Sequence, residues 1–229
     1  ALQILAGGGS NAYAMVGLGG NGTDGSKTGD VYVEAGSLLL RAGPGAGGST
    51  VLGNGGGRTG GGNANLGAAT GDFDLRIGAG GIQLEGGSGN DAFAQIGNVG
   101  LGDAASHGGN IRIHNAGDLR LVGGSGTGNS DAVIGHGDRL SGGTHQGDLW
   151  IRTLGDTSLS DGVGMAILGH AGTAATTGST NFALITGTLS DGGSSYGLGG
   201  AIRRMIPNGN IDIGVLHGDL LIAGAATAV

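Results

Sequence analysis

Short alternating strands recur along the chain, each introduced by a glycine and then an aspartate or asparagine. The three residues after that pair are apolar at the first and third positions, which predicts a strand with one buried and one exposed face. The five triplets are Val31-Tyr32-Val33, Phe73-Asp74-Leu75, Ile111-Arg112-Ile113, Leu149-Trp150-Ile151 and Ile211-Asp212-Ile213. Repetition of one pattern along a single chain is typical of solenoid proteins.

We call each triplet the second strand of a repeating unit, because a first strand precedes it and a third strand follows it. The first strand precedes it and ends on a glycine, as in residues 14–17, 94–97, 132–135 and 166–169, with 50–53 a looser copy. The third strand opens about eight residues later, in residues 37–40, 81–84, 118–121, 156–159 and 219–222. A unit therefore holds three short strands joined by glycine-rich turns, and it returns every 30 to 42 residues or so.

Helices are not expected, because no stretch sustains the i, i+3, i+4 apolar spacing and glycine interrupts every candidate. Three strands joined only by turns match one rung of a parallel β-helix, in which stacked rungs bury each other's apolar faces. We therefore expect an all-β fold, a β-solenoid of about six rungs that spans residues 1–229 as a single segment. A β-propeller is the competing repeat fold, but its blades need four strands.

The fifth unit departs from the pattern. Thr180-Asn181 stands where Gly-Asp is expected, and the later strand is unclear over residues 186–191. The sixth unit resumes the pattern, since residues 197–200 repeat the Gly-Leu-Gly-Gly of residues 17–20. We expect a degenerate rung at this point.

The alignment of the glycines also predicts which charged residues lie on neighbouring rungs. Three opposite-charge pairs result: Glu34 over Arg76, Asp74 over Arg112, and Arg41 over Glu85. Such pairs favour a register by about 0.2–1 kcal/mol each. Exposed ion pairs contribute little to stability, so these pairs support the alignment more than they stabilise the fold.

Composition narrows the function classes. Glycine makes up 60 of the 229 residues, and cysteine is absent. The chain therefore has no disulfide and no thiolate chemistry, which fits a secreted protein stabilised by repetition. A net charge of −7 without a basic run argues against a nucleic-acid partner. No apolar segment approaches the length of about 18 residues that a membrane span needs.

The repeated elements resemble those of large bacterial exoproteins. Ala-x-Ile-Gly-x-Gly, Gly-Asp-apolar-x-apolar and Gly-Asp-Leu-x-Leu-x-x-Gly-x-Gly are similar to repeats of the filamentous-haemagglutinin type and of autotransporter passenger domains, and residues 132–137 and 166–172 match best. The resemblance covers essentially the whole chain. It implies a right-handed parallel β-helix that is secreted, attached to the bacterial cell surface or built into extracellular filaments, with adhesion or matrix roles.

The sequence predicts a strand followed by a turn at both ends of the chain. Residues 1–5 resemble a third strand, and residues 219–229 are a third strand with its turn. Solenoids need capped ends to stay soluble, and an uncapped rung is a template for further strand pairing. We expect a segment of a longer repeat array, or a subunit that stacks end to end on copies of itself.

Metal binding has two candidate positions. Residues 86–93 fit one copy of a nonapeptide calcium-binding pattern that includes Asp91. Such sites need tandem copies of the pattern. We therefore favour the interpretation that these residues form an ordinary turn, with calcium binding as the alternative. His136 and His170 occupy the same position in successive units without a third ligand. A ladder of polar turn residues is favoured there, and no cofactor is expected.

The remaining candidates concern carbohydrate. Trp150 and Tyr32 are expected to point outward on one face, three rungs apart, where they could stack on a host or matrix glycan. Polysaccharide lyases and hydrolases also use this fold, but they need clustered carboxylates, and the outward positions here hold no neighbouring pair. We expect a scaffold rather than an enzyme: a stiff rod of a secreted adhesin or extracellular filament that presents glycine-rich loops. A glycan-binding module is the alternative, and a polysaccharide-acting enzyme is the third hypothesis.

Overall fold

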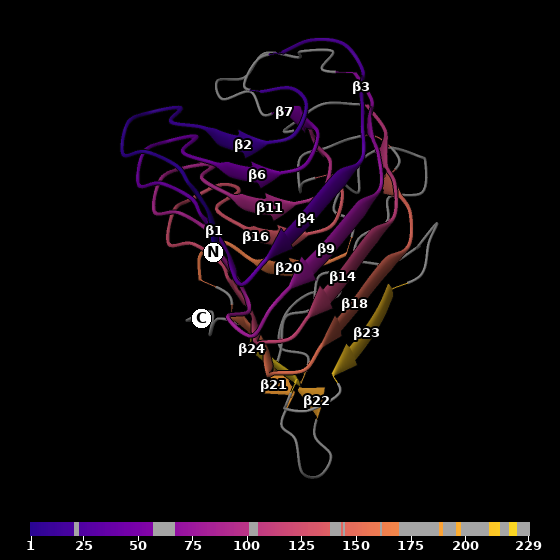
Figure 1. The fold of residues 1–229 in the computed structure, drawn as a ribbon. Helices are drawn as coiled ribbons and strands as arrows, with labels where there is room; N and C mark the ends of the chain where they lie inside the picture. Colours follow the sequence, from indigo (N-terminus) through magenta and orange to yellow (C-terminus); the bar gives the residue numbers. More distant parts are fainter. Residues whose placement is uncertain are drawn as a thin grey trace.

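The structure, a computed structural model, describes residues 1–20, 23–56, 67–100, 105–137, 143, 145–160 and 162–169. Beyond these it describes the strands at 188–189, 196–197, 211–215 and 220–223. The described residues form strands and turns without a helix, so none of them belongs to a helix that could cross a membrane. Parallel strands stack in successive coils (Figure 1), which confirms the expected β-solenoid.

Three parallel sheets hold the three strands expected in each unit. The first strands form a sheet of β2 (Ala14–Val16), β6 (Thr50–Leu52), β11 (Ala94–Ile96), β16 (Ala132–Ile134) and β20 (Ala166–Leu168). The second strands form a sheet of β4 (Val31–Ala35), β9 (Phe73–Ile77), β14 (Ile111–Asn115), β18 (Leu149–Thr153) and β23 (Ile211–Val215). The third strands form a sheet of β1 (Leu2–Leu5), β5 (Leu38–Arg41), β10 (Ile82–Glu85), β15 (Leu119–Val122), β19 (Thr157–Ser160) and β24 (Leu220–Ala223).

Shorter strands that the sequence pattern did not predict complete the coils. Two-residue strands just before the second strands form a further parallel sheet of β3 (Lys27–Thr28), β8 (Ala69–Thr70), β13 (His107–Gly108) and β17 (His145–Gln146). In addition, β7 (Gly55–Gly56) pairs with β12 (Val99–Gly100), and β21 (Thr188–Leu189) pairs antiparallel with β22 (Tyr196–Gly197). Two residues are too few to show an alternating pattern, so these strands left no signal in the sequence.

The solenoid makes about four turns, fewer than the expected six rungs. Leu2, Leu38, Ile82, Leu119 and Thr157 follow one another in register on successive third strands. The degenerate fifth unit adds no strand to the second-strand and third-strand sheets, because β18 pairs directly with β23, and β19 with β24. That unit lacks the Gly-Asp pair and apolar triplet that build a second strand. Thr180-Asn181 lies outside the described residues, as does most of 186–191.

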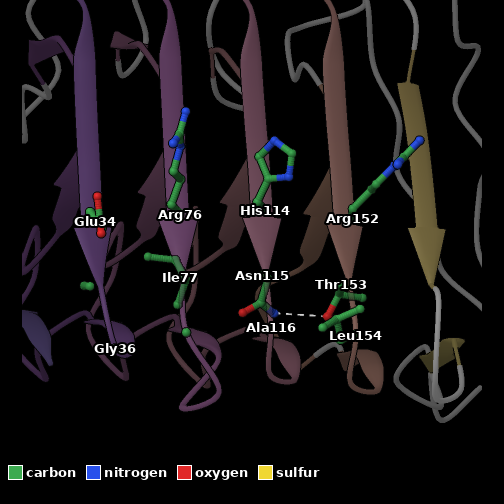
Figure 2. A pocket seen from close by; sticks show the side chains of 12 residues that line it. Glu34, Gly36, Arg76, Ile77, His114, Asn115, Ala116, Arg152, Thr153 and Leu154 are labelled. Atoms are coloured by element: carbon green, nitrogen blue, oxygen red, sulfur yellow. Dashed lines mark hydrogen bonds between the residues drawn. The ribbon is translucent and has the colours of Figure 1, made fainter.

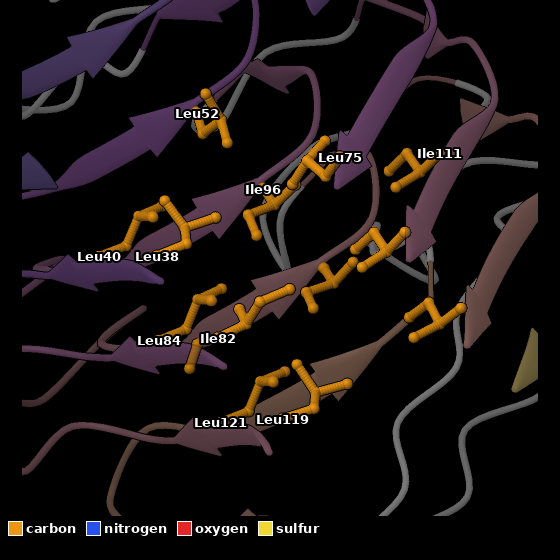
Figure 3. Close-up of a cluster of buried hydrophobic side chains, with 14 of the residues drawn as sticks. Leu38, Leu40, Leu52, Leu75, Ile82, Leu84, Ile96, Ile111, Leu119 and Leu121 are labelled. Carbon is orange, nitrogen blue, oxygen red and sulfur yellow. The ribbon is translucent and has the colours of Figure 1, made fainter. Parts of the chain in front are cut away.

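The core is an aliphatic column inside the coils (Figure 3). Leu40, Leu84 and Leu121 align in register on adjacent third strands, and each is fully buried. Leu75 and Ile113 form the matching ladder on the second strands. Burial of one such side chain contributes about 1.5–3 kcal/mol, so repetition of the ladders stabilises the coils although each rung is thin.

The first strands differ from the second strands, in which one face is buried and the other meets solvent. All three residues of β6, β11, β16 and β20 are buried. Val51 packs in a cluster with Phe93 and Val99, while Val133 and Ile167 pack together. Gln95 stands at the same outward position of β11, where it is buried and donates to the carbonyls of Gly135 and Gly137. These strands are therefore buried on both sides.

Close approach between coils explains the glycines that punctuate the repeat. Gly97 follows a first strand with φ +138°, and a Cβ there would collide with the carbonyl oxygen of Gly135 in the next coil. Gly109, which opens a Gly-Asn pair, has φ +133° and would collide with the carbonyl of Gly71 in the same way. Only glycine adopts such a conformation without a steric penalty, so the stacking itself requires these residues.

The predicted charge register is confirmed. The structure aligns Glu34 with Arg76, Asp74 with Arg112, and Arg41 with Glu85. Arg41 and Glu85 form the expected ion pair across strands. Arg76 instead lies 3.4 Å, from Nη2 to Oδ2, from Asp74 of its own strand, because residues two apart on one face compete with the neighbour across the ladder.

Candidate functional site

A groove crosses the second strands where they end. Its volume is about 1000 Å³. Four consecutive strands, β4, β9, β14 and β18, each contribute their last two residues to its lining, and the turn after each strand contributes one more: residues 34–36, 76–78, 114–116 and 152–154. Figure 2 shows these residues side by side along the stacking direction. Because every coil supplies the same three positions, the groove runs parallel to the axis of the solenoid.

One side of the groove is a row of charged and ionisable side chains. Glu34, Arg76, His114 and Arg152 occupy equivalent positions in register, and all four are exposed. Alternation places them outward because Val33, Leu75, Ile113 and Ile151 next to them face the core. The row therefore holds one carboxylate followed by three consecutive basic or ionisable side chains.

The other side of the groove is formed by the turns into the third strands. Gly36, Gly78, Ala116 and Leu154 stand there in succession. The three smaller residues leave space beside the charged row, and Leu154 is 42% exposed. This wall therefore offers little hydrogen-bonding capacity from its side chains.

The base of the groove is held by buried polar side chains. Asn115 donates from Nδ2 to Thr153 Oγ1 at 3.1 Å, as Figure 2 shows, and to the carbonyl of Gly117 at 2.8 Å. Thr153 Oγ1 donates to the same carbonyl at 2.6 Å. Both side chains are buried at inward positions where Ile77 stands in the preceding coil. These bonds fix the turn and with it the base of the groove.

Trp150 is part of the basic face rather than an isolated platform. The guanidinium carbon of Arg152 lies 4.8 Å from the Trp150 ring centroid, and the His114 ring meets Trp150 edge-on at 4.6 Å. Cation–π contact of this kind is worth about 0.5–1 kcal/mol when exposed. The indole therefore holds Arg152 and His114 in place from the adjoining position.

Tyr32 lies at the other end of the same face, three strands from Trp150, as the spacing predicted. It is 58% exposed, and its hydroxyl donates to Glu34 Oε2 at 2.8 Å. That hydrogen bond is the main cause of a raised pKa for Tyr32. The pKa of Arg76 is raised chiefly by its hydrogen bond to Asp74, so the guanidinium stays charged.

His136 is buried and lies in a ladder of polar residues that follow the first strands. Its Nδ1 accepts from the backbone N–H of Asn98 at 3.0 Å, and its Nε2 lies 2.8 Å from the carbonyl oxygen of Gly109. Asn98 and Asn54 hold the same position in the two preceding coils, where Oδ1 accepts from the backbone one coil earlier. Both ring nitrogens are therefore occupied by the backbone, and His170 lies outside the described residues.

A second histidine pair escaped the sequence analysis. His107 and His145 are buried and their rings stack with centroids 5.1 Å apart. His145 Nδ1 accepts from the His107 backbone N–H at 3.3 Å. Each stands two residues before a Gly-Asn or Gly-Asp pair. This shared position in successive units could have predicted that the two histidines lie next to each other. No group of three metal-ligating side chains occurs among the described residues.

Asp91 stabilises a turn. It has φ +54°, and its Oδ1 accepts from the backbone N–H of Asn129 in the next coil at 3.0 Å. Asn11, Gly47 and Gly128 also have positive φ at turns of the other coils. Aspartate, asparagine and glycine are the residues that tolerate this region, so backbone conformation accounts for the residue type.

The fold defines this protein as a β-solenoid repeat protein whose basic groove runs along one edge of a sheet. No family model matches the chain, and no curated protein or solved structure matches it either.

Proposed function

We propose that the chain is a structural scaffold, a stiff rod within a secreted bacterial adhesin or an extracellular filament at the cell surface. The observation that carries this proposal is the continuity of stacking: three parallel sheets keep one register through successive coils. The resemblance of the repeats to filamentous-haemagglutinin-type exoproteins supports the same role. Such a rod works mechanically and needs no cofactor.

Side chains reinforce this stacking from inside. Asn54, Asn98 and His136 link each coil to the one before it through backbone N–H groups. Asn98 also donates from Nδ2 to the carbonyl of Gly108 at 2.7 Å, which ties the segment after the first strand to β13, just before the second strand. Bending or shearing the rod would break these buried bonds together with the backbone ladders, so the arrangement resists deformation.

Strand pairing at the end of the rod is the mode of assembly that we propose. Among the described strands, β1, β2 and β4 each have a paired neighbour on one side only. Val16 and Leu18 are 42% and 50% exposed on that end of the first-strand sheet. Unpaired strand edges with apolar side chains favour the addition of another strand, supplied by a neighbouring repeat or by a second copy of the chain.

Electron microscopy and fibre diffraction test this assembly. We expect thin filaments with a meridional reflection near 4.8 Å, the spacing of paired strands. Lysine at the edge, Val16→Lys with Leu18→Lys, is expected to shorten or abolish the filaments, because charge at an edge opposes pairing. Val163→Lys, at a residue 61% exposed in a turn, is the matched control and should leave them intact. Single particles from the unaltered chain would contradict the filament proposal.

A further inference from the structure

We infer that the groove along β4, β9, β14 and β18 binds a linear, carboxylate-bearing polysaccharide laid parallel to the solenoid axis. This binding activity is separate from the scaffold role and does not depend on filament formation. It follows from the charge, the spacing and the shape of the groove.

The groove carries basic side chains, although the protein as a whole is acidic. The chain has 10 lysine and arginine residues against 17 aspartate and glutamate residues. Three of those ten, Arg76, Arg112 and Arg152, nevertheless project from adjacent strands of one sheet face, and His114 stands between two of them. Glu34 and Asp74 share this face, and Asp74 pairs with Arg76. The excess of positive charge therefore rests on Arg112 and Arg152. A local excess of positive charge in an acidic protein attracts a negatively charged ligand to that place. An anionic ligand is therefore indicated.

The spacing favours a polymer with regular charges. Neighbouring strands lie about 4.8 Å apart, so Arg76, His114 and Arg152 present nitrogen donors at one interval along the axis. That interval is close to the length of one sugar ring in an extended polysaccharide. Guanidinium groups bind carboxylates through two parallel hydrogen bonds, and a uronic acid supplies one carboxylate on each ring.

The shape of the groove suits an extended sugar chain. Its inner wall of Gly36, Gly78 and Ala116 leaves room beside the charged row, and Leu154 offers an apolar contact for a sugar ring. The base is already fixed by the hydrogen bonds of Asn115 and Thr153. Binding a ligand here therefore requires little ordering of the protein, which reduces its entropic cost.

Trp150 contributes by positioning. Because Arg152 lies over the indole and His114 meets its edge, both side chains are held toward the groove before a ligand arrives. Glu34 acts in the opposite sense at the end of the row, where its carboxylate repels an anionic chain. The polysaccharide is thus expected to occupy the section from Arg76 to Arg152.

The test uses the full chain and polygalacturonate as the probe, with methyl-esterified polygalacturonate as the uncharged counterpart. We expect saturable binding to the acid form, weak binding to the ester, and loss of binding in about 1 M salt, where the Debye length falls to about 3 Å. Arg152→Gln should weaken binding about tenfold, since it removes a charge-assisted contact. Arg120→Gln, at an exposed arginine of β15 outside the groove, is the matched control and should have no effect.

A variant that gains affinity guards against an uninformative loss of folding. Glu34→Gln removes the repelling carboxylate and should tighten binding to polygalacturonate about two- to fivefold. Equal binding to the acid and the ester, equal weakening by Arg152→Gln and Arg120→Gln, or no gain from Glu34→Gln would each overturn the inference. Filament formation is scored separately, so failure of the scaffold proposal would not be mistaken for failure of this one.

Discussion

Replacing His136 by alanine tests whether the internal ladder stabilises the rod. The imidazole is fully buried, accepts from the Asn98 N–H at 3.0 Å and lies 2.8 Å from the Gly109 carbonyl oxygen. Because Nδ1 accepts, the proton of the neutral ring lies on Nε2 and is donated to that carbonyl. Alanine would leave both backbone groups buried without these partners, at about 1–3 kcal/mol each. We therefore expect His136→Ala to lower the free energy of unfolding by about 2–6 kcal/mol.

The natural ladder supplies the matched control. Asn54 and Asn98 occupy the same position in the preceding coils. There the side-chain oxygen accepts from the backbone of the previous coil, and the side-chain nitrogen donates to the carbonyl of Thr70 or Gly108, at the end of a two-residue strand. His136→Asn can form the same two bonds, although it gives up the ring contact with Phe73, whose centroid lies 5.9 Å away. We expect it to cost about half as much as alanine or less.

Denaturant unfolding followed by far-ultraviolet circular dichroism measures the difference. The free energy of unfolding of a domain is about 5–15 kcal/mol, so the predicted loss is a large fraction of the total stability. If asparagine destabilised the chain as much as alanine, the cost would come from packing and the hydrogen-bond argument would be refuted. A loss below about 0.5 kcal/mol for alanine would refute it as well.

Two further substitutions test the same geometry. Gly97→Ala should cost about 2–4 kcal/mol, while Gly9→Ala, where nothing lies within 4 Å, should change stability by less than about 0.5 kcal/mol in thermal unfolding. Asp91→Asn should be nearly neutral and Asp91→Ala should cost about 1–2 kcal/mol, and a calcium-dependent stability lost in Asp91→Asn would contradict the turn assignment.

The repeat pattern alone was sufficient to predict most of the solenoid. The Gly-Asp and Gly-Asn pairs marked the start of each second strand, and the alignment of Asp74 with Arg112 and of Arg41 with Glu85 is the register that the structure has. This works because parallel stacking makes each rung the template for the next, so a local pattern and a long-range contact carry the same information. The sequence pattern breaks down around Thr180-Asn181, and there β18 pairs directly with β23 of the next unit.

The candidate site could be predicted only in part. The sequence placed Trp150 and Tyr32 outward on one face and three strands apart, which the structure confirms. It did not show that Arg152 and His114 enclose the indole, because χ angles of exposed side chains depend on neighbours across the ladder. Nor did it show the groove, which exists only where the strand ends and turns of four coils come together.

Alternation with a period of two is a property of the sequence, and by itself it determined which residues of each strand share a face. What covers that face was decided by the tertiary structure. His114 and His136 are both histidines of repeated units, yet one is exposed beside a groove and the other is fully buried. The first strand β6 is likewise covered on its outer side by Phe93 and Val99, which flank the next first strand. Such burial depends on how the turns fold back over the sheet, which is a contact between segments that no local pattern encodes.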